Sequence, residues 1–260
     1  MIKITKVILL FLLIFVFIFT FILLQCLFVF FRKKRTYFIS RAIHIFSVFA
    51  CIIMGIKIKI KGLSELRKKR GLFLVTNHIS YIDGIVASRI FPLVFIARGD
   101  LKEWPLFGIF SRASETVFIN RTSYGNLHKE IENVSSLLKD GVNVILFPQG
   151  TTTSMIEEVS FRSSLFQAPI VASCDILPFT IKYKKINGQN IDDKNKDLVF
   201  WYGDMEFTPH LFSFFNLKSI EEEVHILSLI KVSSQDNRKA ISMVSQEAIN
   251  TNLMEGVCPN

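Results

Sequence analysis

Cysteine is scarce in this chain, and the few cysteines exclude several classes of protein. Among 260 residues there are four, Cys26, Cys51, Cys174 and Cys258, and two of them lie in strongly apolar segments. They show neither the spacing of metal ligands nor the pattern of a disulfide framework. We therefore expect reduced thiols, as in a protein that faces the cytosol. Internal repeats and low-complexity linkers are also missing, which favours a single main domain.

Charged residues are missing from a long N-terminal run. Residues 7–31 contain no Asp, Glu, Lys or Arg, and this run exceeds the roughly 20 residues that cross a hydrocarbon core as a helix. We predict a transmembrane helix. A secretory signal peptide is the alternative, but its apolar region is usually about 7 to 15 residues long and ends at small residues. Here the basic residues 32–35 follow instead, and they place the rest of the chain in the cytoplasm.

A second apolar segment, residues 42–56, is interrupted by His44 and Ser47 and is fifteen residues long. As a helix it would reach about 22 Å, which is short for a membrane span. Because both of its flanks are basic, we predict an interfacial or re-entrant helix. The predicted organisation is an anchor at residues 1–35, a linker with the second apolar helix at residues 36–61, and a main domain at residues 62–260.

The chain has fewer acidic than basic residues, with 22 Asp and Glu and 31 Lys and Arg, so that its net charge is +9. The basic residues cluster at residues 32–35 and between Lys57 and Arg70. Such clusters occur in proteins that bind nucleic acid or anionic lipid, and also as plain solvated faces. The chain carries no nucleic-acid-binding motif, and its clusters lie beside apolar segments. We therefore expect contact with membrane lipid and no nucleic-acid partner.

The order of apolar runs and amphipathic segments predicts an α/β fold with a largely parallel central sheet flanked by helices. Residues 56–61 alternate isoleucine with lysine, which indicates a half-buried strand whose lysines face solvent or lipid headgroups. Further strands are expected at residues 71–77, 92–97, 116–120, 142–147, 176–183, 198–202 and 224–232, and helices at residues 101–111, 124–139 and 237–252.

Polar side chains stand at the ends of four of these strands. His78 directly follows one strand, and Arg98, Arg121 and Gln149 stand at or just past the ends of three others. Because the carboxyl ends of parallel strands meet at one edge of a sheet, we expect these side chains together. Asp83 lies five residues after His78, a spacing that suits a turn entering a helix. A carboxylate on one ring nitrogen of a histidine leaves the other nitrogen to accept a proton.

Three ordered blocks carry a family resemblance. His78 and Asp83 match a His-x-x-x-x-Asp block, Arg121 ends a second block, and residues 147–151 match a Phe-Pro-Glu-Gly-Thr block with one change. A weaker fourth block, an apolar strand with a proline, is similar to residues 176–179. In this order the blocks resemble the glycerolipid acyltransferases, and most closely the lysophosphatidic acid (1-acylglycerol-3-phosphate) acyltransferases.

Two positions depart from the family pattern. Gln149 stands where the family has glutamate, and Thr152 stands where arginine is common. Arg98 replaces a lysine that the family tends to have, which keeps the charge but changes the geometry of the group. The resemblance covers most of the chain from residue 40 to residue 250.

The resemblance implies a membrane-bound enzyme that moves a fatty acyl group from a thioester to the sn-2 hydroxyl of 1-acylglycerol 3-phosphate. The product would be phosphatidic acid for phospholipid synthesis. His78 would take the hydroxyl proton and Asp83 would orient the ring, so that no Ser or Cys nucleophile is needed. The partners would be a lysophospholipid, membrane lipids and acyl-CoA or acyl carrier protein as the donor. No cofactor and no metal is expected, and the adjacent Asp192 and Asp193 are interpreted as a solvated turn.

The resemblance also implies roles for five substrate-binding residues. Arg121 and Arg98 would hold the phosphate of the acceptor by charge-assisted hydrogen bonds. Backbone N–H groups around Gly150 and Thr151 would stabilise the tetrahedral oxyanion, since glycine permits close approach. Gln149 occupies the position of a carboxylate that helps to organise the acceptor site in the family.

Three other interpretations stay open. The acceptor could be a lyso-ornithine lipid or lysophosphocholine instead. The two departures are also compatible with an inactive relative that binds lipid, although His78 and Asp83 are both retained. A serine hydrolase would use Ser80 or Ser164 as its nucleophile, but neither serine stands in a nucleophile-elbow sequence.

Overall fold

The computed structural model describes residues 2–104, 107–119, 126–154 and 160–255. Within these residues one sheet has the strand order β1-β8-β6-β2-β5-β3-β4, and β7 pairs with β6. The strands are β1 (Ile56–Gly62), β2 (Phe73–Thr76), β3 (Leu93–Arg98), β4 (Val117–Ile119), β5 (Asn143–Leu146), β6 (Ile176–Ile186), β7 (Gln189–Asn190) and β8 (Ile220–Ile226). Only the pairs of β6 with β7 and with β8 are antiparallel in the described sheet. The predicted α/β fold with a largely parallel sheet is confirmed.

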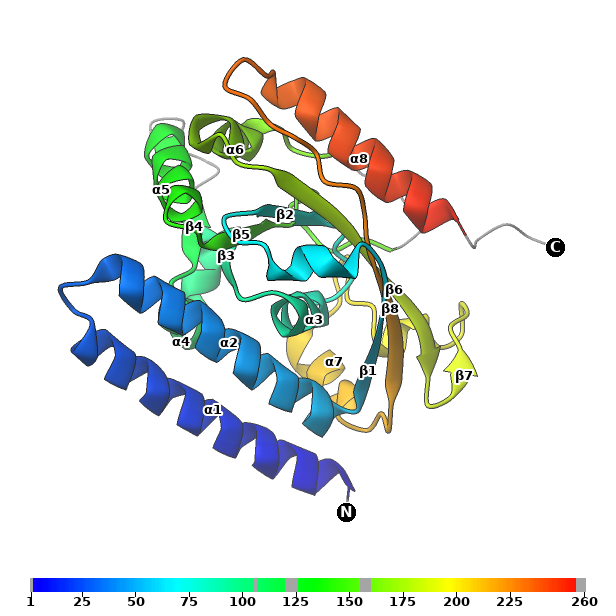
Figure 1. Ribbon diagram of the computed structural model, residues 1–260. Coiled ribbons are helices and arrows are strands. Elements are labelled where there is room, and N and C mark those ends of the chain that lie inside the picture. Colours follow the sequence, from blue (N-terminus) through cyan, green and yellow to red (C-terminus); the bar gives the residue numbers. More distant parts are fainter. Residues whose placement is uncertain (1, 105–106, 120–125, 155–159, 256–260) are drawn as a thin grey trace.

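Helices cover both faces of this sheet (Figure 1). Helices α2, α3 and α7 lie on one face, and α5, α6 and α8 lie on the other. The α-helices are α1 (Ile2–Leu27), α2 (Arg32–Met54), α3 (Ile82–Ile90), α4 (Phe107–Ala113), α5 (Leu127–Lys139), α6 (Gln167–Ala172), α7 (Phe207–Phe214) and α8 (Arg238–Met254). Short 3-10 helices are η1 (Ser64–Lys68), η2 (Gly99–Glu103), η4 (Ser164–Phe166) and η5 (Lys196–Leu198).

The central strands are buried on both faces, as their continuous apolar runs predict. In β2 all four residues are buried, and successive side chains enter opposite cores. Leu74 packs in the core under α2 and α3, whereas Phe73 and Val75 pack in the core under α5 and α8. Each such side chain contributes about 1.5–3 kcal/mol when fully buried, so β2 is held rigidly where it presents the residues that follow it.

The N-terminal helices α1 and α2 form an antiparallel hairpin along one side of the domain (Figure 1). The predicted second helix of fifteen residues is wrong in its start, because α2 begins at Arg32 and runs for 23 residues. The basic residues 32–35 are its first turn rather than a break between two segments. Both helices are long and apolar enough to cross a membrane, so shortness is no argument against a span for the second one.

Polar contacts fasten both ends of the hairpin to the domain. Near the start of α1, the Lys6 ammonium donates to the carbonyl oxygens of Met54 at 3.1 Å and Leu217 at 2.6 Å. At the other end, the Arg35 Nε lies 2.5 Å from the Glu115 Oε1. The hairpin is therefore packed along the domain rather than attached to it at one point.

Strand β1 confirms the alternation of residues 56–61. It pairs in parallel with β8 and forms one edge of the sheet, although the sequence assigned these residues to the linker. Its lysines face a row of glutamates on β8, with Lys57 3.9 Å from Glu221 and Lys61 2.8 Å from Glu223. Part of the positive charge expected to face lipid headgroups is thus balanced within the protein.

The predicted strand at residues 198–202 is wrong, because this segment is the end of η5 followed by an irregular stretch. The Trp201 N–H donates to the Ile79 carbonyl at 3.0 Å, so this backbone pairs with the loop after β2 instead of with the sheet. Helix α7, which was not predicted, follows it. The predicted helix at residues 101–111 is divided into η2 and α4. The predicted strand at residues 224–232 is β8, which begins and ends earlier because the acidic residues 221–223 are paired with β1 on one side and β6 on the other.

Candidate active site

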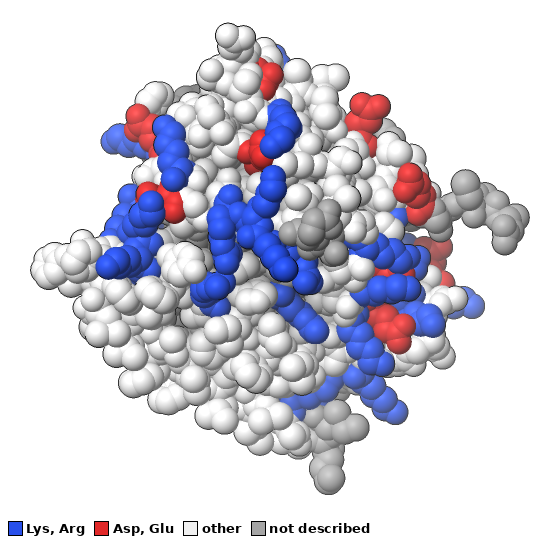
Figure 2. All heavy atoms as spheres, viewed as in Figure 1, with Lys and Arg blue, Asp and Glu red and all other residues white. Residues whose placement is uncertain are grey.

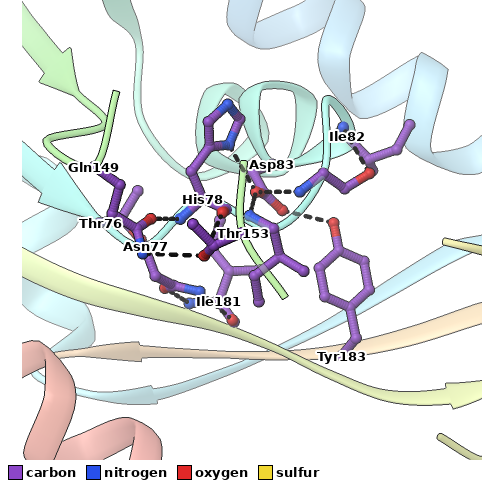
Figure 3. A network of polar contacts seen from close by, with 11 residues as sticks. Thr76, Asn77, His78, Ile82, Asp83, Gln149, Thr153, Ile181 and Tyr183 are labelled. Atoms are coloured by element: carbon purple, nitrogen blue, oxygen red, sulfur yellow. Dashed lines mark hydrogen bonds and ion pairs between the residues drawn. The ribbon is translucent and has the colours of Figure 1, made fainter. Parts of the chain in front are cut away.

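The loop between β2 and α3 brings His78 and Asp83 into contact (Figure 3). Strand β2 ends at Thr76 and α3 begins at Ile82. The intervening loop folds so that the His78 Nδ1 lies 2.9 Å from the Asp83 Oδ2. The two residues that the sequence paired therefore lie together, at the carboxyl end of a central parallel strand.

The Asp83 carboxylate is fully buried, and four hydrogen-bond donors surround it. Besides the His78 ring, its Oδ2 accepts the N–H groups of Ile79 at 2.7 Å and Ser80 at 2.9 Å. Its Oδ1 accepts the Tyr183 hydroxyl at 2.6 Å from strand β6. Asp83 also stands in the first turn of α3, where the helix dipole favours a negative charge. These donors replace the water that a buried carboxylate loses.

The contact with Asp83 fixes the tautomer of His78. Because the carboxylate accepts, the His78 Nδ1 carries the donated proton and the Nε2 keeps its lone pair. The ring stacks on Phe147 with centroids 4.1 Å apart, and the His78 side chain is 21% exposed. The second nitrogen points away from the carboxylate (Figure 3). The ring is thus held rigidly with one basic nitrogen directed outward.

Gln149 fastens the backbone at His78. Its side-chain oxygen accepts the His78 N–H at 2.6 Å, and its amide nitrogen donates to the Thr153 hydroxyl at 3.3 Å. The Thr153 N–H in turn donates to the His78 carbonyl at 3.0 Å. An amide suits this position because one end accepts and the other donates, which a carboxylate does not do. The Gln149 amide, which stands where the family has glutamate, thus uses both its oxygen and its nitrogen in hydrogen bonds.

The sequence analysis missed three residues that support the site, namely Asn77, Thr153 and Tyr183. The Asn77 side chain accepts the Ile181 N–H at 2.9 Å and donates to the Ile181 carbonyl at 3.0 Å, which ties the loop to β6. A polar residue at the end of an apolar strand was a usable signal for Asn77. Tyr183, at the end of a predicted strand, was a second signal of this kind.

A buried acid lies behind Tyr183. Glu222 of β8 is the cross-strand neighbour of Tyr183 and is 1% exposed. Burial raises the pKa of Glu222 well above its usual range, and the Asp83 charge adds to this shift. Its carboxyl oxygens have no hydrogen-bond partner among the described residues. Burial, with the nearby Asp83 charge, also raises the pKa of Tyr183, whose hydroxyl keeps the proton that it donates to Asp83.

The turn after β5 contains the predicted oxyanion donors. Gly150 has a φ of 77°, a left-handed conformation that favours glycine. Its N–H donates to the Phe147 carbonyl at 3.1 Å and is therefore engaged within the turn. Thr151 is exposed next to it, and its N–H has no acceptor in the described part of the chain. Of the two predicted backbone donors, the structure leaves that of Thr151 available.

The two predicted arginines have different outcomes. Arg98 ends β3, at the same sheet edge as His78, but its guanidinium forms a two-point ion pair with Asp100 at 2.7 and 3.0 Å. Its side chain is 49% exposed and is not brought to the His78 ring by any described contact. Arg121 lies outside the described residues. The structure therefore brings together His78, Asp83 and Gln149 and does not add Arg98 to them.

The adjacent aspartates are occupied within their own loop. Asp192 accepts the backbone N–H groups of Lys194 at 2.9 Å and Asn195 at 3.1 Å. Asp193 lies 2.6 Å from the Lys196 ammonium. Among the residues that the structure describes, no group of three or more His, Cys, Asp or Glu side chains is arranged to hold a metal ion.

Comparison with known proteins decides the family. A family model described as acyltransferase matches residues 57–182, which include every predicted site residue. The chain is also 30% identical over 207 residues to the lyso-ornithine lipid O-acyltransferase of Rhizobium meliloti (strain 1021), covering 77% of this chain and 70% of that protein. The chain belongs to the glycerolipid acyltransferase family.

Other members and a solved structure agree with this assignment. The acyltransferase is 26% identical over 202 residues to the 1-acyl-sn-glycerol-3-phosphate acyltransferase of Neisseria meningitidis serogroup B, covering 78% of this chain and 76% of that protein. It matches the crystal structure of the 1-acyl-sn-glycerophosphate acyltransferase PlsC from Thermotoga maritima with a TM-score of 0.62. That match has 19% identity and covers 100% and 99% of the two chains, and it supports the fold.

Membership of the glycerolipid acyltransferase family makes this chain an acyltransferase of lipid biosynthesis. The family implies a lysolipid acceptor and an acyl donor as substrates. The relatives differ in the acceptor that they are named for, so the family does not distinguish between acceptors. The two apolar N-terminal helices indicate association of this acyltransferase with a membrane.

Proposed function

We propose that this acyltransferase moves a fatty acyl group from a thioester to the sn-2 hydroxyl of 1-acylglycerol 3-phosphate. The observation that carries the proposal is the state of His78. One ring nitrogen donates to a fully buried carboxylate and the other is free and directed outward. A general base needs this arrangement, because the free nitrogen takes the proton and the carboxylate stabilises the imidazolium that forms.

The reaction then follows in two proton transfers. The His78 Nε2 takes the proton of the acceptor hydroxyl while its oxygen attacks the thioester carbonyl. The resulting tetrahedral intermediate collapses, the C–S bond breaks, and the imidazolium returns the proton to the departing thiolate. Asp83 is held by its four hydrogen-bond donors, so that its carboxylate orients the His78 ring. No covalent acyl-enzyme is required, and the cost of losing the base is about 10² to 10⁴-fold in rate.

The substrate-binding roles are proposals of the same kind. The N–H of Thr151 stabilises the oxyanion, because that of Gly150 is already engaged in the turn. Arg121 holds the acceptor phosphate, and Arg98 joins it only when the ion pair with Asp100 opens. Gln149 acts by holding the His78 backbone rather than by contacting the acceptor.

A lyso-ornithine lipid is the second candidate acceptor. Proteins named lyso-ornithine lipid O-acyltransferase from Rhizobium meliloti and Brucella abortus are 30% and 29% identical to this chain. The Neisseria relatives named for 1-acyl-sn-glycerol 3-phosphate are 26% and 27% identical. Both acceptors offer a hydroxyl to the same base, and they differ in the charge of the headgroup.

We further infer that the catalytic residues face the cytoplasm, where acyl-CoA or acyl carrier protein supplies the donor. The test is an acyl-transfer assay of the purified full-length protein with both donors against three acceptors, 1-acylglycerol 3-phosphate, lyso-ornithine lipid and lysophosphocholine. The proposal expects the highest kcat/KM with 1-acylglycerol 3-phosphate. A higher kcat/KM with lyso-ornithine lipid would show that this lipid, and not 1-acylglycerol 3-phosphate, is the preferred acceptor. The absence of transfer to all three acceptors would favour an inactive lipid-binding relative.

A further inference from the structure

A cleft of about 400 Å³ opens between α2, η1 and the C-terminal end of α3. Five basic side chains line it, Arg41, Arg67, Lys68, Arg70 and Arg89, and we call it the basic cleft. They come from three segments that are separate in the sequence. Figure 2 shows Lys and Arg side chains gathered on this face, along the border of the apolar N-terminal helices.

The described side chains around the basic cleft leave its positive charge without a paired acid. Within the described residues none of its five basic side chains forms an ion pair, whereas the neighbouring Lys69 lies 4.0 Å from Asp175. Arg89 donates to the Ile56 carbonyl at 3.2 Å. Glu222 lies near Arg89, and burial raises the pKa of Glu222, which disfavours a negative charge there. Over the described side chains, the cleft therefore concentrates positive charge, which attracts an anion.

The basic cleft lies at the opposite edge of the sheet from His78. Arg70 shortly precedes β2, whereas His78 follows the same strand. Helix α3 connects the two places, with Asp83 in its first turn and Arg89 in its last. Its nine residues separate them by about 12 Å at the helical rise. An anion in the cleft is thus distinct from the acceptor at the catalytic histidine.

The surroundings of the basic cleft favour a lipid over a free anion. Three apolar residues, Val48, Ile90 and Pro92, line the same cleft beside the charges. On α2 the cleft-facing residues Arg41 and Val48 are seven apart, two helical turns. Ile45, Phe49 and Ile52 follow the same spacing on the outer face and are 53%, 51% and 63% exposed. The cationic cleft therefore meets an apolar helix surface, as the headgroup region of a bilayer requires.

We propose that the basic cleft binds the phosphate of an anionic membrane glycerophospholipid, at a site separate from the active site. The guanidinium groups hold the phosphate by charge-assisted hydrogen bonds, and the apolar residues contact the glycerol and the start of the acyl chains. The bound lipid holds the domain against the bilayer beside the middle of α2. The proposal does not depend on which lysolipid the enzyme acylates.

The test measures binding of dihexanoyl phosphatidylglycerol to the full-length protein in neutral detergent micelles. Arg67→Gln combined with Arg70→Gln removes two charges from the cleft. Lys57→Gln combined with Lys59→Gln is the matched control, since both lysines are 71% exposed and lie outside the cleft. Each cationic group near an anionic lipid is worth about fivefold in affinity. The cleft pair should weaken binding about tenfold or more, and the control pair less than about twofold.

A third variant and two other ligands complete the test. Arg41→Gln removes a charge contributed by α2 and should weaken binding about fivefold, with the thermal unfolding of each variant compared with the wild type. Dihexanoyl phosphatidylcholine should bind at least about tenfold more weakly than the anionic lipid. Equal losses in the cleft pair and the control pair would overturn the proposal, because they would show diffuse attraction. Inorganic phosphate that binds as tightly as the lipid would overturn it too.

Discussion

The contact between Tyr183 and Asp83 leads to a quantitative prediction. Tyr183→Phe removes only the hydroxyl that donates to the Asp83 Oδ1 at 2.6 Å. The phenyl ring keeps its place in the core, where it lies 5.6 Å from the Phe200 ring. Asp83 keeps its other three donors on Oδ2, but one oxygen of a fully buried carboxylate loses its partner.

The size of the effect follows from the negative charge of Asp83, which accepts the hydrogen bond. A hydrogen bond to a charged group contributes about 1.5–3 kcal/mol to stability, and a change of 1 kcal/mol moves the Tm of a domain of this size by about 2–4 °C. We therefore expect a loss of about 3 to 12 °C in Tm. Without its donor on Oδ1 the Asp83 carboxylate is held through Oδ2 alone and orients the His78 ring less firmly, so kcat should fall by up to about 10²-fold. The KM of the acceptor should change little.

Tyr202→Phe provides the matched control. The Tyr202 hydroxyl donates to Asp197 at 3.0 Å on the exposed surface, and its loss should cost no more than about 0.5 kcal/mol. Thermal unfolding in detergent and steady-state acyl transfer would be measured for both variants. The reasoning is refuted if Tyr183→Phe keeps the Tm and kcat of the wild type, as the control is expected to do.

Three further predictions concern other parts of the chain. Gln149→Glu should stay active, because it keeps the oxygen that accepts the His78 N–H. Because it adds one negative charge, it should raise the KM for a phosphate-bearing acceptor by a larger factor than it lowers kcat. A larger change in kcat than in KM would contradict this. Glu222→Gln should gain stability over the wild type as pH rises above about 4.5. The raised pKa of Glu222 makes the folded state keep a proton that the unfolded state loses, at about 1.4 kcal/mol per pH unit; a difference in Tm that is constant between pH 5 and pH 7 would be inconsistent with a raised pKa. The full-length protein should stay with membranes through high salt and alkaline extraction, because helices α1 and α2 are long and apolar enough to insert and inserted helices are not held by charge alone. Release into the alkaline supernatant would contradict insertion.

Local sequence patterns predicted the centre of the site because the pair is local. His78 and Asp83 are five residues apart, and the apolar strand before them sets where they stand. Tyr183 lies 100 residues from Asp83 in the chain. Its contact depends on the register of β6 against β2, which no local pattern specifies. Asp100 is only two residues from Arg98 in the chain. The sequence alone could therefore have predicted that Asp100 competes with the acceptor phosphate for the Arg98 guanidinium.

The remaining errors have similar physical causes. Basic residues 32–35 were taken as the boundary of a segment, but Lys and Arg are good helix formers and simply occupy the first turn of α2. The apolar residues Val199 and Phe200 are buried as a strand would be. Their backbone nevertheless does not pair with any strand of the described sheet. The Phe200 carbonyl lies 3.0 Å from the His210 Nε2 of α7, and the next residue, Trp201, donates its N–H to the Ile79 carbonyl of the active-site loop. Burial without a strand partner is a tertiary effect, and apolar runs alone do not reveal it.

The most direct test of the central claim is acyl transfer by His78→Ala. The purified variant would be compared with the wild type and with His128→Ala, whose histidine is 83% exposed on α5. If the His78 ring is the base that takes the proton of the acceptor hydroxyl, kcat should fall by about 10² to 10⁴-fold in His78→Ala and stay unchanged in His128→Ala. A folded His78→Ala protein that transfers acyl groups at nearly the wild-type rate would contradict the account.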